Sequence, residues 1–234
     1  GGTPSLLTPD DVARLMEAAQ PRPGAEITLE ANPETVTEET LRGFRAAGVN
    51  RISFGVQSAR DSQLKTLGRP HTAKQARAAF AAAQRAGFTN ISGDIMLALP
   101  HYTQAEFDET LELIENGGAT HVSAYLLKIE PDSAFGRKPP EGLPTSDEAA
   151  DFYLYAVEQL EHHGYQQYES TTSSTGTAGI TLASAQRPTP AWAASVSTTR
   201  LIRMPFYTIP PPRCWTAAAA RRIISFCSSA SARG

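Results

Sequence analysis

The sequence predicts an α/β fold in which parallel strands are covered by outer helices, followed by an irregular C-terminal tail. Three observations lead to this prediction. Residues 1–169 alternate strand and helix patterns, polar residues recur at the ends of the strands, and the composition changes at residue 170. The chain has 234 residues, which is long enough to bury a substantial core.

The composition excludes several classes of protein. Apolar residues make up 41% and charged residues 19%, and no apolar run approaches the ~18 residues that span a bilayer. The opening Gly1-Gly2-Thr3-Pro4 does not resemble a signal peptide. Only Cys214 and Cys227 are present, too few for a disulfide framework, and the net charge of −3 argues against a nucleic-acid partner. We therefore expect a cytoplasmic protein.

The first half of the chain predicts three helices and two strands. Thr8-Pro9-Asp10-Asp11 is a capped helix start, with Pro in the first turn. Residues 26–30 alternate as a strand does, and Thr37 begins a helix that ends at Gly48. A strand follows over 51–56. An Ala-rich helix then runs over 72–86 before Gly87.

The second half continues the alternation. Strands are expected over 90–97, 121–127 and 165–169, and helices are expected over 104–114 and from a cap at Ser146. Strands that run the same way need helical crossovers, so the alternation indicates a parallel sheet.

Polar residues at strand ends favour a barrel over a doubly wound sheet. Glu30, Gln57, Asp94 and Glu130 each lie at or near the carboxyl end of an expected strand, where a (β/α) barrel carries its active-site rim. The Gly-x-Gly-x-x-Gly dinucleotide fingerprint follows none of the strands. Each polar residue could also cap a helix or turn a loop, but four together are better explained by a ligand.

The composition divides the chain at residue 170. All 24 acidic residues lie in 1–169, whereas residues 170–234 contain no Asp, Glu, Lys, His or Asn but include seven Arg and twenty Ser or Thr. Two explanations compete: a disordered extension, or a stretch read in the wrong frame from GC-rich DNA. We expect domains at 1–145 and 146–169, with an aberrant tail over 170–234.

Six short motifs carry a resemblance to a known family. Together and in order, they resemble the radical S-adenosylmethionine proteins similar to oxygen-independent coproporphyrinogen-III oxidase, specifically the haem-chaperone branch. The motifs are Gly1-Gly2-Thr3-Pro4-Ser5, Leu29-Glu30-Ala31-Asn32-Pro33, Gly55-Val56-Gln57-Ser58, Leu67-Gly68-Arg69-x-His71, Asp94-Ile95-Met96-x-Ala98-Leu99-Pro100 and Ile129-Glu130-Pro131. The match covers residues 1–169 and ends where the acidic residues end, which favours a frame change near 170.

The resemblance implies an incomplete (β/α) barrel of the radical-SAM type that binds S-adenosylmethionine. The implied cofactor-binding residues are Gly1, Gly2, Thr3, Glu30, Gln57, Arg69 and Asp94. Arg69 would hold a carboxylate, and Asp94 would accept from ribose hydroxyls or an amine. On chemistry alone, Gly1-Gly2 could be a frayed terminus, and Arg69 and His71 could lie in a solvated loop.

The resemblance also implies a [4Fe-4S] cluster, whose three cysteines would precede Gly1 in a Cys-x3-Cys-x2-Cys loop. Cys214 and Cys227 do not fit that spacing, so the cluster ligands are absent and no residue is expected to be catalytic. We interpret His121 as structural and His162-His163 as capping a helix. The tail's Trp192 and Trp215 are assigned no role. A barrel without its first strands leaves the strand at 26–30 as an exposed edge, which predicts marginal stability.

Three functions remain open at this point. The first is a haem chaperone, which binds haem or porphyrin and passes haem to an acceptor protein; Glu30-Ala31-Asn32-Pro33 favours it. The second is an oxygen-independent coproporphyrinogen III oxidase, which uses a 5′-deoxyadenosyl radical. The third is a non-radical βα-barrel enzyme whose rim carboxylates act in acid–base chemistry. The chain by itself could also be an inactive fragment.

Overall fold

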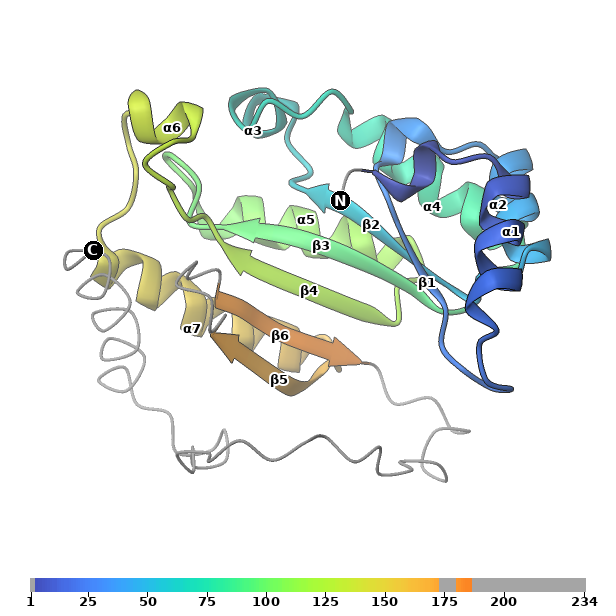
Figure 1. Ribbon diagram of the computed structural model, residues 1–234. Helices are drawn as coiled ribbons and strands as arrows, with labels where there is room; N and C mark the ends of the chain where they lie inside the picture. The colour runs from blue at the N-terminus through green and yellow to red at the C-terminus, as the bar shows by residue number, and fades with distance from the viewer. Residues whose placement is uncertain (1–2, 173–179, 187–234) are drawn as a thin grey trace, which may run out of the picture.

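The computed structural model describes residues 3–172 and 180–186, and the side chains of 3–167. A six-stranded sheet in the order β1-β2-β3-β4-β6-β5 forms the centre, and helices α4, α5 and α7 lie along one of its faces (Figure 1). The strands are β1 (Thr28–Ala31), β2 (Arg51–Gln57), β3 (Ile91–Leu97), β4 (His121–Leu126), β5 (Gln166–Thr172) and β6 (Ile180–Gln186).

The connections from β1 through to β5 contain helices. The α-helices are α1 (Pro9–Ala19), α2 (Glu38–Ala46), α3 (Asp61–Thr66), α4 (Ala73–Arg85), α5 (Gln104–Asn116), α6 (Ala134–Arg137) and α7 (Ser146–His162). Two short 3₁₀ helices are η1 (Pro4–Leu6) and η2 (Pro33–Thr35). The sequence patterns predicted the long helices and the strands β1 to β5, and missed β6 and the short helices η1, η2, α3 and α6. These four helices are only three to six residues long, too short to show a helical period.

Strands β1 to β4 are parallel and adjacent in chain order, as the alternation of strand and helix predicts. Beyond β4 the sheet becomes antiparallel, because β6 pairs with β4 and β5 pairs with β6. The expectation of an irregular tail is therefore corrected at residues 170–172 and 180–186, which are strand. The run 180–186 contains no Gly, Pro or charge, so its local propensity permits a strand where a partner strand is available. The rest of the tail lies outside the described residues.

The two faces of the parallel sheet differ in chemistry. Alternate residues on one face are apolar and buried against the helices: Leu29, Ala31, Ile52, Phe54, Val56, Ile91, Ile95, Leu97, Val122 and Ala124. The other face carries mostly polar residues: Thr28, Glu30, Arg51, Ser53, Gln57, Ser92, Asp94, His121 and Ser123. Parallel strands buried on both faces read as continuous apolar runs. The alternation here therefore gives the sheet a helix-covered face and a polar face.

Helix packing on the apolar face is tight. Gly93 lies on this face, and a Cβ there would meet the side chain of Ile114 in α5 at 2.8 Å. The helices contribute Leu41 and Phe44 from α2, Phe80 from α4, and Phe107 and Leu111 from α5 to the same core.

Threonine capping boxes begin the five longest helices. The caps are Thr8, Thr37, Thr72, Thr103 and Thr145, and in each box the side chain accepts from the third backbone N–H of the helix. The expected cap at Ser146 is corrected by one residue. Thr145 has the extended backbone of an N-cap, and Glu148 completes its box by accepting from the Thr145 N–H at 2.7 Å.

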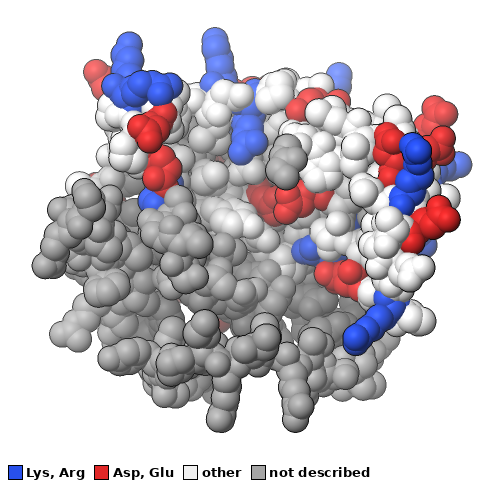
Figure 2. Space-filling model, in the orientation of Figure 1, with Lys and Arg blue, Asp and Glu red and all other residues white. Residues whose placement is uncertain are grey.

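Charged side chains of both signs lie on the surface. Acidic and basic side chains are interspersed over the described part of the face shown in Figure 2. Each helix that the structure describes falls short of the length and apolar content that a bilayer-spanning segment needs.

A pair of leucines tests the assignment of the core. Leu41 in α2 is fully buried, whereas Leu15 in α1 is 52% exposed. Leu41→Ala should lower the free energy of unfolding by about 2–5 kcal/mol, because it leaves a cavity in the core. Leu15→Ala should change it by less than about 0.5 kcal/mol. Urea unfolding of both variants measures the difference, and equal losses would contradict the packing described.

Candidate functional site

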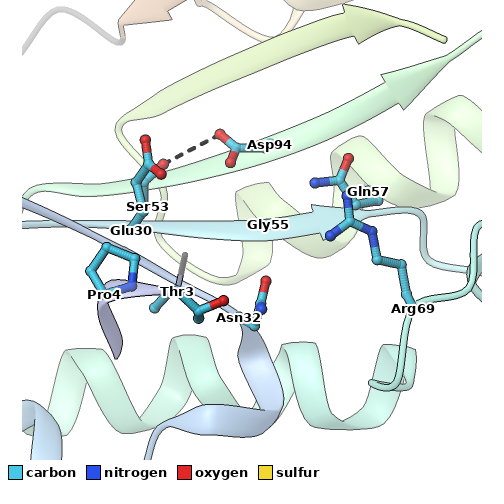
Figure 3. A pocket seen from close by; sticks show the side chains of 10 residues that line it. Thr3, Pro4, Glu30, Asn32, Ser53, Gly55, Gln57, Arg69 and Asp94 are labelled. Atoms are coloured by element: carbon cyan, nitrogen blue, oxygen red, sulfur yellow. Dashed lines mark hydrogen bonds between the residues drawn. The ribbon is translucent and has the colours of Figure 1, made fainter. Parts of the chain in front are cut away.

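A pocket of about 180 Å³ opens on the polar face of the sheet. Its lining comes from β1, β2, β3, the start of η1, the turn into η2 and the loop before α4. The lining residues are Thr3, Pro4, Glu30, Ala31, Asn32, Ser53, Gly55, Gln57, Arg69 and Asp94 (Figure 3). The parallel pairing of the strands explains why these side chains meet. Glu30 on β1 pairs with Ser53 on β2, which also carries Gln57, and Asp94 lies on the neighbouring strand β3.

Asp94 lies half-buried on β3, inside the pocket. Ser53 Oγ donates a hydrogen bond to its Oδ1 at 3.3 Å, as the dashed line in Figure 3 shows. Burial, with a smaller contribution from the nearby charge of Glu30, raises the pKa of Asp94 to about 7. The Ser53 hydrogen bond and the more distant Arg51 and Arg69 act in the opposite direction. Asp94 therefore changes its charge near neutral pH.

Gln57 ends β2 in a strained conformation. Its φ of 66° is in the left-handed region that residues with a Cβ rarely adopt, and its side chain is buried. Its Oε1 is enclosed and accepts no hydrogen bond from any residue that the structure describes. A buried carbonyl oxygen without a donor is costly unless a ligand supplies the donor. The enclosed Oε1 therefore makes Gln57 a candidate for ligand binding.

The glycine at position 55 keeps the floor of the pocket open. A Cβ at Gly55 would lie 3.2 Å from Gln57 Nε2 and 3.6 Å from Asn32 Oδ1. A side chain there would therefore crowd two of the pocket's polar groups.

The pocket contains charges of both signs. Glu30 on β1 is exposed to the opening, and Arg69 is half-buried in the loop between α3 and α4. Neither residue forms a salt bridge with another described residue. Carboxylates and a guanidinium in one small space suit a ligand that carries both a cation and a carboxylate.

The structure brings together the predicted site residues that it describes. Thr3, Glu30, Gln57, Arg69 and Asp94 all line the pocket. Gly1 and Gly2 lie outside the described residues, so their predicted contact with a ligand stays a prediction.

Two expectations near the site are corrected. Glu130 does not line the pocket, because the chain turns away after β4 and Glu130 pairs with Lys128 at 2.6 Å. His71 does not lie in a solvated loop; its side chain is fully enclosed, and its Nε2 lies 3.1 Å from the Val56 carbonyl oxygen.

Two other histidines, His121 and His163, have structural surroundings. His121 is buried next to Ser92 Oγ at 2.7 Å, and burial together with Arg51 lowers its pKa to about 4, so the ring is neutral. His163 follows α7 and pairs with Glu115 at 2.6 Å. Within the described ranges, no three His, Cys, Asp or Glu residues are placed to hold a metal ion. Cys214, Cys227, Trp192 and Trp215 lie outside the described residues.

Sequence reasoning did not assign Pro4, Ala31, Asn32, Ser53 and Gly55 to the site. A signal for two of them was present in the strand 51–57. Ser53 and Gly55 alternate with apolar residues and share a face with Gln57, so a period of two would have placed them on the same face.

Residues 1–114 match the family described as "Radical SAM superfamily". Among curated proteins, the chain is 39% identical over 175 residues to "Heme chaperone HemW" of Haemophilus influenzae, covering 73% of this chain and 45% of that protein. It is also 39% identical over 176 residues to "Radical S-adenosyl methionine domain-containing protein 1, mitochondrial" of Bos taurus, covering 72% of this chain and 40% of that protein. The chain thus spans less than half the length of these relatives.

Solved structures agree on the fold. The coproporphyrinogen III oxidase HemN of Escherichia coli, a radical SAM enzyme, matches with a TM-score of 0.63 and 28% identity, over 71% of this chain and 40% of that one. Elp3 of Methanocaldococcus infernus matches with a TM-score of 0.56 and 16% identity, over 67% of this chain and 43% of that one. The second likeness concerns the fold alone.

The raised pKa of Asp94 predicts a pH dependence of stability. The folded chain holds this proton up to about pH 7, whereas an ordinary aspartic acid has a pKa of 3.8. The folded state therefore binds more protons between these values. This stabilising contribution is present below about pH 4 and is lost as the pH rises through about 7. Asp94→Asn should remove this loss, so the variant should gain stability relative to the native chain at pH 8 but not at pH 4.

Urea unfolding at the two pH values measures this difference, with Asp10→Asn on the exposed start of α1 as the matched control. The same pH dependence in the native chain and in Asp94→Asn would show that the carboxyl group is not perturbed.

Proposed function

The chain belongs to the radical SAM superfamily, and on this premise we propose that its pocket binds S-adenosylmethionine in a protein that acts as a haem chaperone. One observation carries the proposal. Glu30, Gln57, Arg69 and Asp94, from four separate segments, converge on one pocket of about 180 Å³. The family implies S-adenosylmethionine and a [4Fe-4S] cluster; the role in haem handling is the finer part of the proposal.

The residues of the pocket fit S-adenosylmethionine. The Arg69 guanidinium would hold the carboxylate of its methionine part, since a planar fork matches two carboxylate oxygens. Glu30 and Asp94 would lie near its cationic and hydroxyl groups. The enclosed Oε1 of Gln57 would accept a hydrogen bond from one of its N–H or O–H groups. When bound, S-adenosylmethionine supplies a sulfonium centre that radical SAM enzymes cleave reductively.

The described residues lack the ligands that a [4Fe-4S] cluster needs. A [4Fe-4S] cluster is held by thiolates, and residues 3–172 and 180–186 include no cysteine. The described residues therefore do not fit the cluster, and the chemistry that we assign to them is restricted to binding and orienting S-adenosylmethionine.

A chaperone role is favoured by the relatives' names and by one motif. Curated relatives named heme chaperones come from bacteria as different as Haemophilus influenzae, Bacillus subtilis and Escherichia coli, at 34–39% identity. Glu30-Ala31-Asn32-Pro33, which passes from β1 into η2, resembles the chaperone form of its motif. The likeness to HemN at 28% identity supports the second candidate, an oxygen-independent coproporphyrinogen III oxidase.

Titration of the chain with S-adenosylmethionine, followed by calorimetry, tests the binding site. Arg69→Ala should weaken binding about tenfold or more, because it removes a charge-assisted hydrogen bond. Arg69→Lys should recover only part of the loss, since it restores the charge without the planar fork. Arg14→Ala, on the exposed side of α1, is the matched control and should bind like the native chain. Native-like binding by Arg69→Ala would refute this assignment.

A hybrid protein distinguishes the two candidate functions. The matching segment of the Escherichia coli heme chaperone would be replaced by residues 3–169 of this chain, so that the relative supplies the remaining length. We expect the hybrid to bind haem, measured by its visible absorbance, and to leave coproporphyrinogen III unchanged in an anaerobic assay. Turnover of coproporphyrinogen III would favour the oxidase.

A further inference from the structure

A buried histidine and a half-buried glutamate lie close in sequence to residues that line the pocket. The His71 side chain is fully enclosed, and its Nδ1 lies 3.4 Å from Oε2 of Glu34, whose side chain is 19% exposed. Neither Nδ1 nor Oε2 forms a hydrogen bond with any residue that the structure describes. The pair lines no part of the pocket. It therefore requires an explanation other than direct contact with a ligand.

The other ring nitrogen fixes the orientation of His71. Nε2 lies 3.1 Å from the Val56 carbonyl oxygen, which can only accept a hydrogen bond. Nε2 must therefore carry a proton and donate it. Nδ1 then faces the Glu34 carboxylate. The imidazole is thus oriented by the Val56 carbonyl at Nε2 and lies beside a carboxylate at Nδ1.

The Val56 carbonyl belongs to the turn that aims Gln57 into the pocket. It also accepts a hydrogen bond from the Ser58 N–H at 2.8 Å, which closes a three-residue turn around Gln57. Gln57 is the central residue of this turn, at φ 66°. A γ-turn with positive φ is rare and strained, and such a conformation persists only where its surroundings hold it.

Three pocket segments meet at this pair. Glu34 lies in η2, two residues after Asn32; His71 lies two residues after Arg69; and Val56 precedes Gln57. Asn32, Arg69 and Gln57 all line the pocket. The pair is therefore connected through short stretches of backbone to three ligand-facing side chains. Side chains that contact a ligand directly are usually held in place by such supporting hydrogen bonds.

We propose that His71 is a positioning residue for this pocket: by donating from Nε2 to the Val56 carbonyl, and by pairing at Nδ1 with Glu34, it holds the strained turn that presents Gln57 to the ligand. The proposal rests on the proposed function only for the identity of the ligand. The held turn itself is a property of the ligand-free chain.

Two amide-for-imidazole variants test the proposal without a ligand. In His71→Gln the side-chain N–H₂ can reach the position of Nε2 and donate to Val56, whereas the shorter side chain of His71→Asn cannot. Hydrogen exchange of the Ser58 amide, followed by NMR on the full chain, should be as slow in His71→Gln as in the native protein. In His71→Asn it should be about tenfold faster or more. The Thr120 amide, bonded to the Ile91 carbonyl at 2.9 Å, reports on the rest of the sheet and should not change.

Affinity for S-adenosylmethionine is the second measurement. His71→Asn should weaken binding about tenfold, and His71→Gln should restore most of it. Equal Ser58 exchange in His71→Gln and His71→Asn would overturn the proposal, as would native affinity in His71→Asn where the native chain binds. Absence of binding by the native chain, together with the predicted difference in Ser58 exchange, would instead reject S-adenosylmethionine as the ligand and leave the positioning role intact.

Discussion

The parallel register of β1, β2 and β3 is the constraint on which the pocket depends. Because these strands run the same way, Glu30, Gln57 and Asp94 reach the same region of one face. An antiparallel neighbour would carry the end of its strand to the opposite edge. The sheet does become antiparallel beyond β4, where β6 pairs with β4. The helical crossovers that impose parallel pairing therefore also determine where a ligand can bind.

The two faces of this sheet differ in what they contribute: the apolar face forms the core, and the polar face lines the pocket. The apolar face packs against α2, α4 and α5 around residues such as Phe44, Phe80 and Ile114. Two residues on the polar face lower the stability of the fold. Asp94 is held where burial disfavours its charge, and Gln57 has a strained backbone and a buried oxygen without a donor. Such costs are common where a site is organised before its ligand arrives. His71, enclosed behind the turn, provides the support that one of them requires.

The sequence predicted most of the fold and the charged part of the site, for identifiable reasons. Threonine caps and apolar periods mark the long helices, and the motifs that contain Glu30, Gln57, Arg69 and Asp94 carry the family resemblance. It did not predict the roles of Ser53 and His71, because hydrogen bonds such as Ser53 to Asp94, across 41 residues, leave no local pattern. It failed for β6, whose pairing depends on the edge that β4 offers and not on composition. Glu130 was misplaced because the position of a strand end does not reveal where the following loop turns.

A crystal structure of the chain with S-adenosylmethionine tests the central claim most directly, because it locates every contact at once. The account predicts the nucleotide between β1 and β3, with its methionine carboxylate at Arg69 and a donor group at Gln57 Oε1. Density for the molecule at any other place, with this pocket unchanged and filled by water, would contradict it.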